Sequence, residues 1–204
     1  EAGGGGLCVF PRRKGYGRSM RVITGSARGV RLQAPKGMDT RPTLDQVKEG
    51  IFSAIQFEVE GRRVLDLFAG SGQMGIEALS RGAKSAVFVD MRQDACAVVR
   101  SNLEKTRLTP NAQVLRSDYL SYLSHCRETF DLIFLDPPYA DDLLERAVAH
   151  IARFDILAPD GIMIAESPAE KELPKLSAPY RVAREYRYGR IKVTLYRRDG
   201  EETT

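Results

Sequence analysis

The sequence predicts an α/β fold, a doubly wound Rossmann-like sheet that is mostly parallel and closes with a C-terminal antiparallel hairpin. Three observations indicate this class. Short apolar runs alternate with amphipathic segments from residue 63 onward. Most of these runs are apolar at nearly every position, as in strands buried on both faces. A Gly-x-Gly-x-x-Gly loop joins the first run to the helix expected after it.

The composition is that of an ordinary globular protein. Of the 204 residues, 43% are hydrophobic and 28% are charged, and this length can bury a full core without disulfides. The three cysteines are widely spaced and the two histidines have no ligand spacing, so we expect no metal and a reducing compartment, the cytoplasm. No apolar run approaches the roughly 18 residues of a membrane span. We therefore expect no membrane partner. We also expect a monomer.

The first 42 residues are predicted to stand apart from the main domain. Residues 1–19 are rich in glycine and lack periodicity, so we expect a flexible extension. Residues 20–42 predict a small β-hairpin and a linker. The hairpin would pair residues 21–25 with residues 30–34 and place Gly29 in the turn.

The main domain, residues 43–204, is predicted to begin with a helix. Thr43 as N-cap and Gln46 three residues later form a capping box, and helical spacing continues to about residue 57. Strands and helices then alternate with short connections. The strands are expected at residues 63–68, 85–90, 112–118, 130–136 and 161–167, and the helices at residues 75–82, 92–108, 119–125 and 141–154. Alternating strands at residues 180–188 and 191–198 predict the closing antiparallel hairpin.

The glycine loop predicts a nucleoside cofactor. Gly70, Gly72 and Gly75 lie between a strand and a helix, where such loops bind ligands at the carboxyl end of the sheet. Asp90 ends the next strand and is placed to accept hydrogen bonds from ribose hydroxyls. This pattern alone fits NAD as well as other nucleoside cofactors, and glycines that serve only a tight turn remain an alternative.

Four aspartates at successive strand ends favour S-adenosylmethionine over NAD. Asp66 directly precedes the glycine loop, where a carboxylate would repel a pyrophosphate and attract a cation. S-adenosylmethionine carries an ammonium and a sulfonium group and has no phosphate. Asp118 is placed to accept from an adenine amino group, although an aspartate there is also a common helix N-cap. With Asp90 and Asp136 these residues form an acidic rim.

The stretch Asp136-Pro137-Pro138-Tyr139 predicts a clamp for an amino group. Proline has no N–H and restricts the residue before it, so the Asp136 carboxylate and the Pro137 carbonyl are held as acceptors. Together they can bind both hydrogens of an exocyclic amine and direct its lone pair at a methyl carbon on sulfur. The Tyr139 ring can stack on a flipped base. The alternative is a strand-ending turn with an aspartate that caps the next helix.

These motifs resemble a known family. "DLFAGSG" with "DPPY" is similar to class I amino-methyltransferases that act on nucleic-acid bases. More narrowly, "MRVITGSARGVRL", "RPTLDQVKEGIFSAI", "VLDLFAGSGQMGIEALSRGA" and "DLIFLDPPY" resemble the RsmD family of bacterial guanine-N2 methyltransferases of small-subunit (16S) ribosomal RNA. The resemblance extends from about Met20 to Arg197, and residues 1–19 lie outside it.

The resemblance implies a cofactor, a site and a partner. S-adenosylmethionine would be bound by the loop from Phe68 to Gly72, by Asp90 with Met91, and by Asp118 with Tyr119. The resemblance also places Arg41 and Thr43 near the cofactor, and it puts Asp136 to Tyr139 around the target amine. The substrate would be ribosomal RNA within the small subunit or an assembly intermediate.

The charge distribution supports a polyanionic partner. The formal net charge is +4, and basic residues cluster near both ends of the chain. We expect Arg21, Arg28 and Arg31 to bind RNA phosphates. Three other functions remain: an adenine-N6 DNA methyltransferase, which usually needs a separate target-recognition domain; a non-catalytic RNA-binding or assembly factor; and an NAD oxidoreductase, for which no proton-transfer residue is apparent.

Overall fold

The structure, a computed structural model, describes residues 20–37, 42–138 and 142–200, without the side chains of residues 42–44. The predicted extension over residues 1–19 therefore lies outside the described residues. The helices are α1 (Pro42–Ala54), α2 (Gln73–Ser80), α3 (Gln93–Thr106), α4 (Tyr119–His125) and α5 (Leu143–Arg153), with a 3₁₀ turn at Thr109–Asn111. In that part of the chain, no helix has both the length and the hydropathy needed to cross a membrane.

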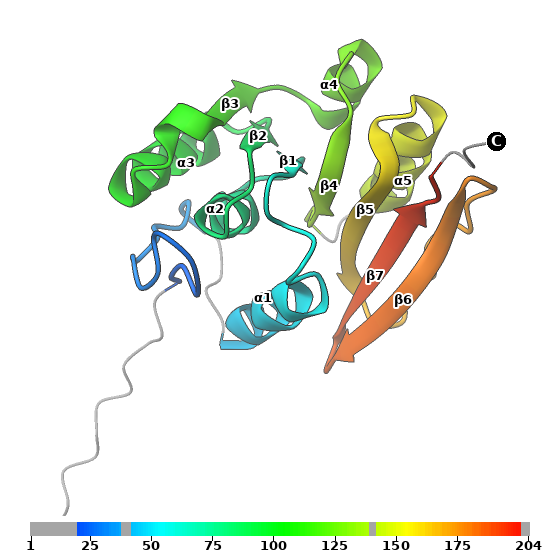
Figure 1. The fold of residues 1–204 in the computed structure, drawn as a ribbon, viewed down its shortest axis with the longest axis horizontal. Coiled ribbons are helices and arrows are strands. Elements are labelled where there is room, and N and C mark those ends of the chain that lie inside the picture. Colours follow the sequence, from blue (N-terminus) through cyan, green and yellow to red (C-terminus); the bar gives the residue numbers. More distant parts are fainter. Residues whose placement is uncertain (1–19, 38–41, 139–141, 201–204) are drawn as a thin grey trace, which may run out of the picture.

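One sheet of seven strands organises the molecule (Figure 1). Its order is β3-β2-β1-β4-β5-β7-β6, and the predicted fold class is confirmed. Strands β1 to β5 pair in parallel, whereas β7 runs antiparallel to both β5 and β6. The strands are β1 (Arg63–Asp66), β2 (Ser85–Asp90), β3 (Ala112–Arg116), β4 (Phe130–Leu135), β5 (Leu157–Pro168), β6 (Tyr180–Tyr188) and β7 (Ile191–Arg198).

Different helices cover the two faces of the sheet. Side chains of α1, α2 and α3 pack on one face together with the N-terminal segment, residues 20–37. Side chains of α4 and α5 pack on the other face. The chain order reverses between β1 and β4, and this switch point is where doubly wound sheets bind ligands at the carboxyl ends of their strands.

The N-terminal segment folds back on itself as a hairpin, but the paired part is shorter than predicted: Val22 N donates to Val30 O at 3.0 Å and Leu32 N donates to Met20 O at 2.8 Å. The structure has a single antiparallel bridge, Arg21 to Arg31. Beyond Val22, the next backbone donors of the segment bind α2 and not the opposite half of the hairpin. The Glu77 carboxylate accepts from Ile23 N at 2.7 Å and from Thr24 N at 3.0 Å.

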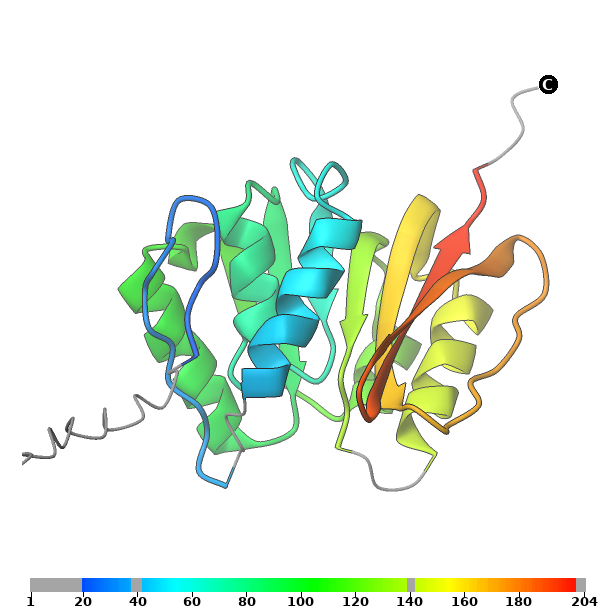
Figure 2. The ribbon, with the colours of Figure 1, turned by 90° about the horizontal axis from the view of Figure 1, so that it is seen from below.

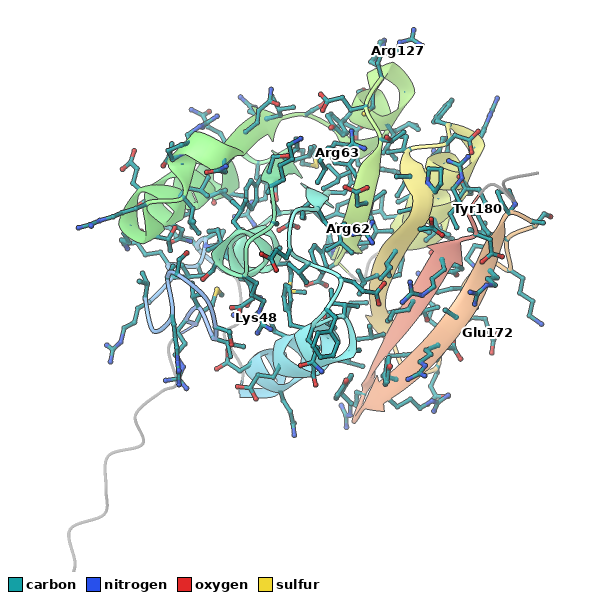
Figure 3. The ribbon with its side chains drawn as sticks, viewed as in Figure 1. Lys48, Arg62, Arg63, Arg127, Glu172 and Tyr180 are labelled. Carbon is teal, nitrogen blue, oxygen red and sulfur yellow. The ribbon has the colours of Figure 1, made fainter. Side chains whose placement is uncertain are left out.

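The N-terminal segment is also anchored by a buried ion pair. Lys48 of α1 lies between that helix and the segment (Figure 3). Its Nζ donates to Arg21 O at 2.7 Å and lies 3.9 Å from the Glu77 carboxylate. Both side chains are almost completely buried, so the segment packs as part of the core. Figure 2 shows it beside α2 and α3, at the opposite end of the sheet from the β6–β7 hairpin.

Helix α1 begins two residues earlier than an N-cap at Thr43 predicts. Pro42 is its first residue, a position that suits proline because the first helical N–H has no intrahelical partner. The predicted N-cap role of Thr43 is therefore wrong, since Thr43 lies inside the helix. The helix ends at Ala54, short of residue 57, and the side chain of Thr43 lies outside the described residues.

Candidate active site

Acidic side chains gather at the carboxyl ends of β2, β4 and β5. Asp66 pairs in register with both Phe88 and Phe134. Two residues further along those two strands, Asp90 and Asp136 therefore stand at one level of the sheet. The register of Leu135 with Ala165 places Glu166 directly beside Asp136 at the same level. The register thus aligns three carboxylates along one edge.

This edge borders a cavity of about 1360 Å³. One end is formed by the glycine loop and the ends of β2 and β3, and we call it the cofactor end. The other end is formed by the ends of β4 and β5 and the β6–β7 turn, and we call it the base end. Of the residues predicted to bind a cofactor, those that line the cavity are Phe68, Gly70, Asp90, Met91, Asp118 and Tyr119. Of the predicted amine clamp, Asp136, Pro137 and Pro138 line it.

Some predicted residues lie elsewhere. Arg41 and Tyr139 fall outside the described residues, as does the side chain of Thr43. Gly72 does not line the cavity, but it has φ +75° and precedes α2, so it makes the sharp turn that starts the helix. Its backbone N–H donates to Ala69 O at 2.6 Å.

The glycine loop is held by Asp90. Gly70, at φ +53°, donates its N–H to Asp90 Oδ2 at 2.9 Å. The other oxygen, Oδ1, accepts from Arg92 N at 2.8 Å. At Gly75 an added Cβ would come within 2.3 Å of the Phe88 ring, so this glycine permits α2 to pack closely on β2. The loop conformation and the Asp90 carboxylate are therefore fixed together.

Asp118 caps helix α4. Its Oδ1 accepts from Leu120 N at 3.0 Å and from Ser121 N at 3.1 Å. The N-cap alternative left open by the sequence is thus what the structure has. Because Asp118 also lines the cavity, its carboxylate can face a ligand while it holds the helix. Beside it, the rings of Phe68 and Tyr119 lie 5.4 Å apart between centroids and form an apolar wall.

Asp66 does not take the position that the sequence suggested. Its side chain is buried, accepts from Gly75 N at 3.0 Å and does not line the cavity. Burial raises the pKa of the Asp66 carboxyl to about 7, with a further rise from Asp90 and an opposing effect from the Gly75 N–H. The expectation that Asp66 meets a cationic ligand is therefore wrong. Its carboxyl group instead holds the last glycine of the loop, Gly75, by a hydrogen bond.

Asp136 stands at the base end in a different environment. It is half-buried at the cavity wall, and Pro137 behind it is buried. Burial raises the pKa of the Asp136 carboxyl well above its usual range, and the neighbouring carboxylates of Glu166 and Asp66 raise it further. The next two residues are prolines, which have no N–H to offer this carboxylate.

The sequence analysis did not predict two parts of the base end. Glu166 is buried and lines the cavity. The feature of the sequence that could have indicated it is an acidic residue near the end of an otherwise apolar strand. The turn between β6 and β7 also borders the cavity, with the residues Arg187 to Ile191. Tyr188 positions this turn, because it lies so close to α1 that a Cβ at Gly50 would come within 2.1 Å of its hydroxyl oxygen.

The basic side chains predicted to bind RNA lie outside the cavity. Arg21, Arg28 and Arg31 are exposed on the N-terminal segment and do not line it. Gly37, at the end of the same segment, does line it. In the described part of the chain, no group of three or more His, Cys, Asp or Glu side chains is arranged to hold a metal ion.

Comparisons with known proteins fit this geometry. The family model described as conserved hypothetical protein 95 matches residues 20–197. The Bacillus subtilis protein named "Putative rRNA methyltransferase YlbH" is 45% identical over 184 residues, which cover 89% of this chain and 100% of that protein. "Ribosomal RNA small subunit methyltransferase D" of Escherichia coli is 33% identical over 191 residues, which cover 94% of this chain and 96% of that protein.

Solved structures agree with the sequence relatives. The structure described as "Putative methyltransferase yhhF from Escherichia coli" has a TM-score of 0.81 and 31% identity, and the match covers 89% of this chain and 99% of that chain. A structure from Haemophilus influenzae, described as a "putative methylase", has a TM-score of 0.75 and 29% identity over 88% of this chain and 98% of that chain.

Proposed function

Because the chain belongs to the RsmD family, matched over residues 20–197 by the model described as conserved hypothetical protein 95, we propose that it methylates ribosomal RNA. The methyl group passes from S-adenosylmethionine to the N2 amine of a guanine in small-subunit RNA. The resemblance found in the motifs is confirmed by the relatives, two of which carry the names of rRNA methyltransferases. The observation that carries the proposal is a single cavity with the Asp90–glycine loop at one end and Asp136-Pro137-Pro138 at the other.

The cofactor end fits S-adenosylmethionine. The rings of Phe68 and Tyr119 offer an apolar wall to an adenine, and Asp118 beside them can accept from its amino group. Asp90, at the end of β2, is placed for ribose hydroxyls. When bound, the cofactor supplies an electrophilic methyl carbon on a sulfonium. The rest of the chemistry is positioning by residues of this chain.

The base end fits an exocyclic amine. Such an amine is a poor nucleophile because its lone pair is delocalised into the ring. The Asp136 carboxylate and the Pro137 carbonyl accept its two hydrogens, and Pro137 and Pro138 keep this turn rigid. The amine is thereby held with its lone pair directed towards the cofactor end, and such orientation can supply an effective molarity of about 10⁵ M or more.

The substrate is proposed to be the assembled small subunit or an assembly intermediate, acted on by one copy of the protein in the cytoplasm. The described residues form one sheet with its helices, and no second folded unit among them could read several base pairs of DNA. The shape of pre-folded RNA and its proteins would then supply most of the specificity. Adenine-N6 methylation of DNA is the main rival, because it can use the same Asp-Pro-Pro-Tyr sequence.

Methyl transfer to defined substrates tests the proposal. The protein is incubated with labelled S-adenosylmethionine and with small subunits, free ribosomal RNA or DNA from a strain that lacks it. We expect label in the small subunits or their RNA, and we expect N2-methylguanosine after nuclease digestion. Label in N6-methyladenine of DNA, or in none of the substrates, would contradict the proposal.

A further inference from the structure

Glu166 is a buried carboxylate in a strand that is otherwise mostly apolar. In β5, Ile162 and Ile164 point to the same face as Glu166 and pack in the core beneath α1. The Glu166 side chain borders the cavity and is only 9% exposed. Glu166 therefore stands at the cavity wall, next to the predicted amine clamp.

Glu166 and Asp136 present their carboxylates side by side. They follow the paired residues Leu135 and Ala165 on neighbouring parallel strands, whose backbones are about 4.8 Å apart. Phe134 and Ile164, two residues earlier, share one core cluster, so both acids point to the same face of the sheet. Glu166 raises the pKa of Asp136 more than any other neighbouring charge does. The base end therefore presents a row of acceptors to the cavity.

Guanine carries such a row of donors. Its Watson–Crick edge presents N1–H next to the N2 amine, whereas adenine presents an acceptor, N1, next to its N6 amine. We propose that the Glu166 carboxylate accepts the guanine N1–H while Asp136 and the Pro137 carbonyl hold the N2 amine, so that Glu166 selects guanine. This inference rests on the proposed function and adds to it the residue that reads the base.

The same geometry rejects adenine. With the N6 amine in the clamp, adenine N1 would face the Glu166 carboxylate, and two acceptors would oppose each other. A hydrogen bond to a charged acceptor contributes about 10- to 100-fold in binding, and a site that leaves a buried acceptor unmatched discriminates at least as strongly. The expected preference for a base with N1–H is therefore about 10- to 100-fold in kcat/KM.

One base analogue isolates the N1 contact. 2-Aminopurine keeps the amine at position 2, but its N1 is an acceptor. Small subunits are reconstituted with guanine or 2-aminopurine at the methylated nucleotide, and kcat/KM is measured for both. We expect the wild-type protein to prefer guanine by about 10- to 100-fold. Glu166→Gln offers an amide N–H to the acceptor, so its preference should fall to about one or reverse.

Glu172→Gln is the matched control. Glu172 is exposed on the connection between β5 and β6 and does not line the cavity (Figure 3). Its variant should keep the wild-type preference. Affinity for S-adenosylmethionine should be unchanged in both variants, because Glu166 lies at the base end.

The outcomes separate the two proposals. If Glu166→Gln keeps the wild-type preference for guanine, the inference is overturned. An equal loss of kcat/KM on both bases also overturns it, because that result would indicate a structural role for Glu166. Methylation of guanine by the wild-type protein with either of these results leaves the proposed function intact. If the wild-type protein methylates neither base, the proposed function fails and the inference fails with it.

Discussion

The two ends of the cavity use carboxylates in opposite ways. At the cofactor end, Asp90 accepts from Gly70 N and Arg92 N, and Asp118 accepts from Leu120 N and Ser121 N. At the base end, Asp136 is followed by two prolines, and its nearest charges are other acids. Backbone donors therefore stabilise the negative charge at one end, whereas burial and repulsion disfavour it at the other.

This difference indicates two kinds of preorganisation. Carboxylates that already bind backbone N–H groups fix loops in place and present their remaining lone pairs to a ligand at little cost. Where burial and neighbouring carboxylates raise the pKa of a carboxyl group, as at Asp136, a donor group of the substrate relieves that cost only on binding, so the group contributes most when the substrate is bound. The cofactor end should thus control binding of S-adenosylmethionine, and the base end should control the reaction.

The largest expected effect comes from Asp136→Ala. Alanine removes the side-chain acceptor and leaves only the Pro137 carbonyl, so the two hydrogens of the amine can no longer both be held. We expect methyl transfer to fall by about 10²- to 10⁴-fold, while the Kd for S-adenosylmethionine stays within about twofold. Single-turnover transfer and calorimetry measure the two quantities. Wild-type turnover, or a parallel loss of cofactor affinity, would remove the distinction between the ends.

The reverse pattern is expected for Asp90→Asn. Loss of the charge weakens its hydrogen bonds with Gly70 N and with ribose hydroxyls, each of which is worth about 1.5–3 kcal/mol when the acceptor is ionised. The Kd for S-adenosylmethionine should rise by about 10- to 100-fold. The rate at saturating cofactor should change far less than in Asp136→Ala. A Kd equal to that of the wild type would show that Asp90 does not bind the cofactor.

The sequence predicted the strand ends better than the directions of the side chains there. Apolar runs mark buried strands, and in a parallel sheet their carboxyl ends meet at one edge, so Asp90 and Asp136 could be placed. The side chain of Asp66 could not be placed, because the sequence does not show that its carboxyl group accepts the Gly75 N–H. Register between strands decides such contacts, and the pairing of Asp136 with Glu166 depends on two strands that are distant in sequence.

The N-terminal hairpin is shorter than predicted for a related reason. Alternating residues and Gly29 fit a hairpin locally, and the chain does reverse there. The competing acceptor, Glu77, lies more than fifty residues away and takes the N–H groups of Ile23 and Thr24. Local pattern cannot reveal a buried carboxylate from another element, so tertiary contacts shorten the predicted ladder.

The pH dependence of stability sharpens the comparison. Folding raises the pKa of Asp66 from an ordinary value of about 4 to about 7, so the folded state holds the proton more tightly than the unfolded state. The free energy of unfolding should fall as the pH rises from about 4 to about 7 and then level off. Asp66→Asn should flatten this fall. The slope should not vanish, because Asp136 titrates in the same direction.

Urea midpoints measured at several pH values test this expectation. Asn at position 66 keeps an oxygen for the Gly75 N–H, so the variant should still fold. Glu172→Gln serves as the control, since that side chain is exposed and should leave the wild-type slope unchanged. An Asp66→Asn variant with the full wild-type slope would show that this carboxyl titrates normally.

The smallest expected effects concern the RNA backbone. Phosphates are bound by cations, and exposed arginines stand at both ends of the sheet. Arg28 and Arg31 lie on the N-terminal segment, whereas Arg187, near the end of β6, and Arg190, in the β6–β7 turn, border the cavity at its base end. Each lost contact with a phosphate of single-stranded RNA should flatten the log–log salt dependence of binding by about 0.7. Double alanine variants of the two pairs, assayed for RNA binding across a salt series, show which end of the sheet binds the RNA. An unchanged slope in Arg28→Ala/Arg31→Ala would exclude the N-terminal segment. A flatter slope in both double variants would indicate RNA that spans the cavity.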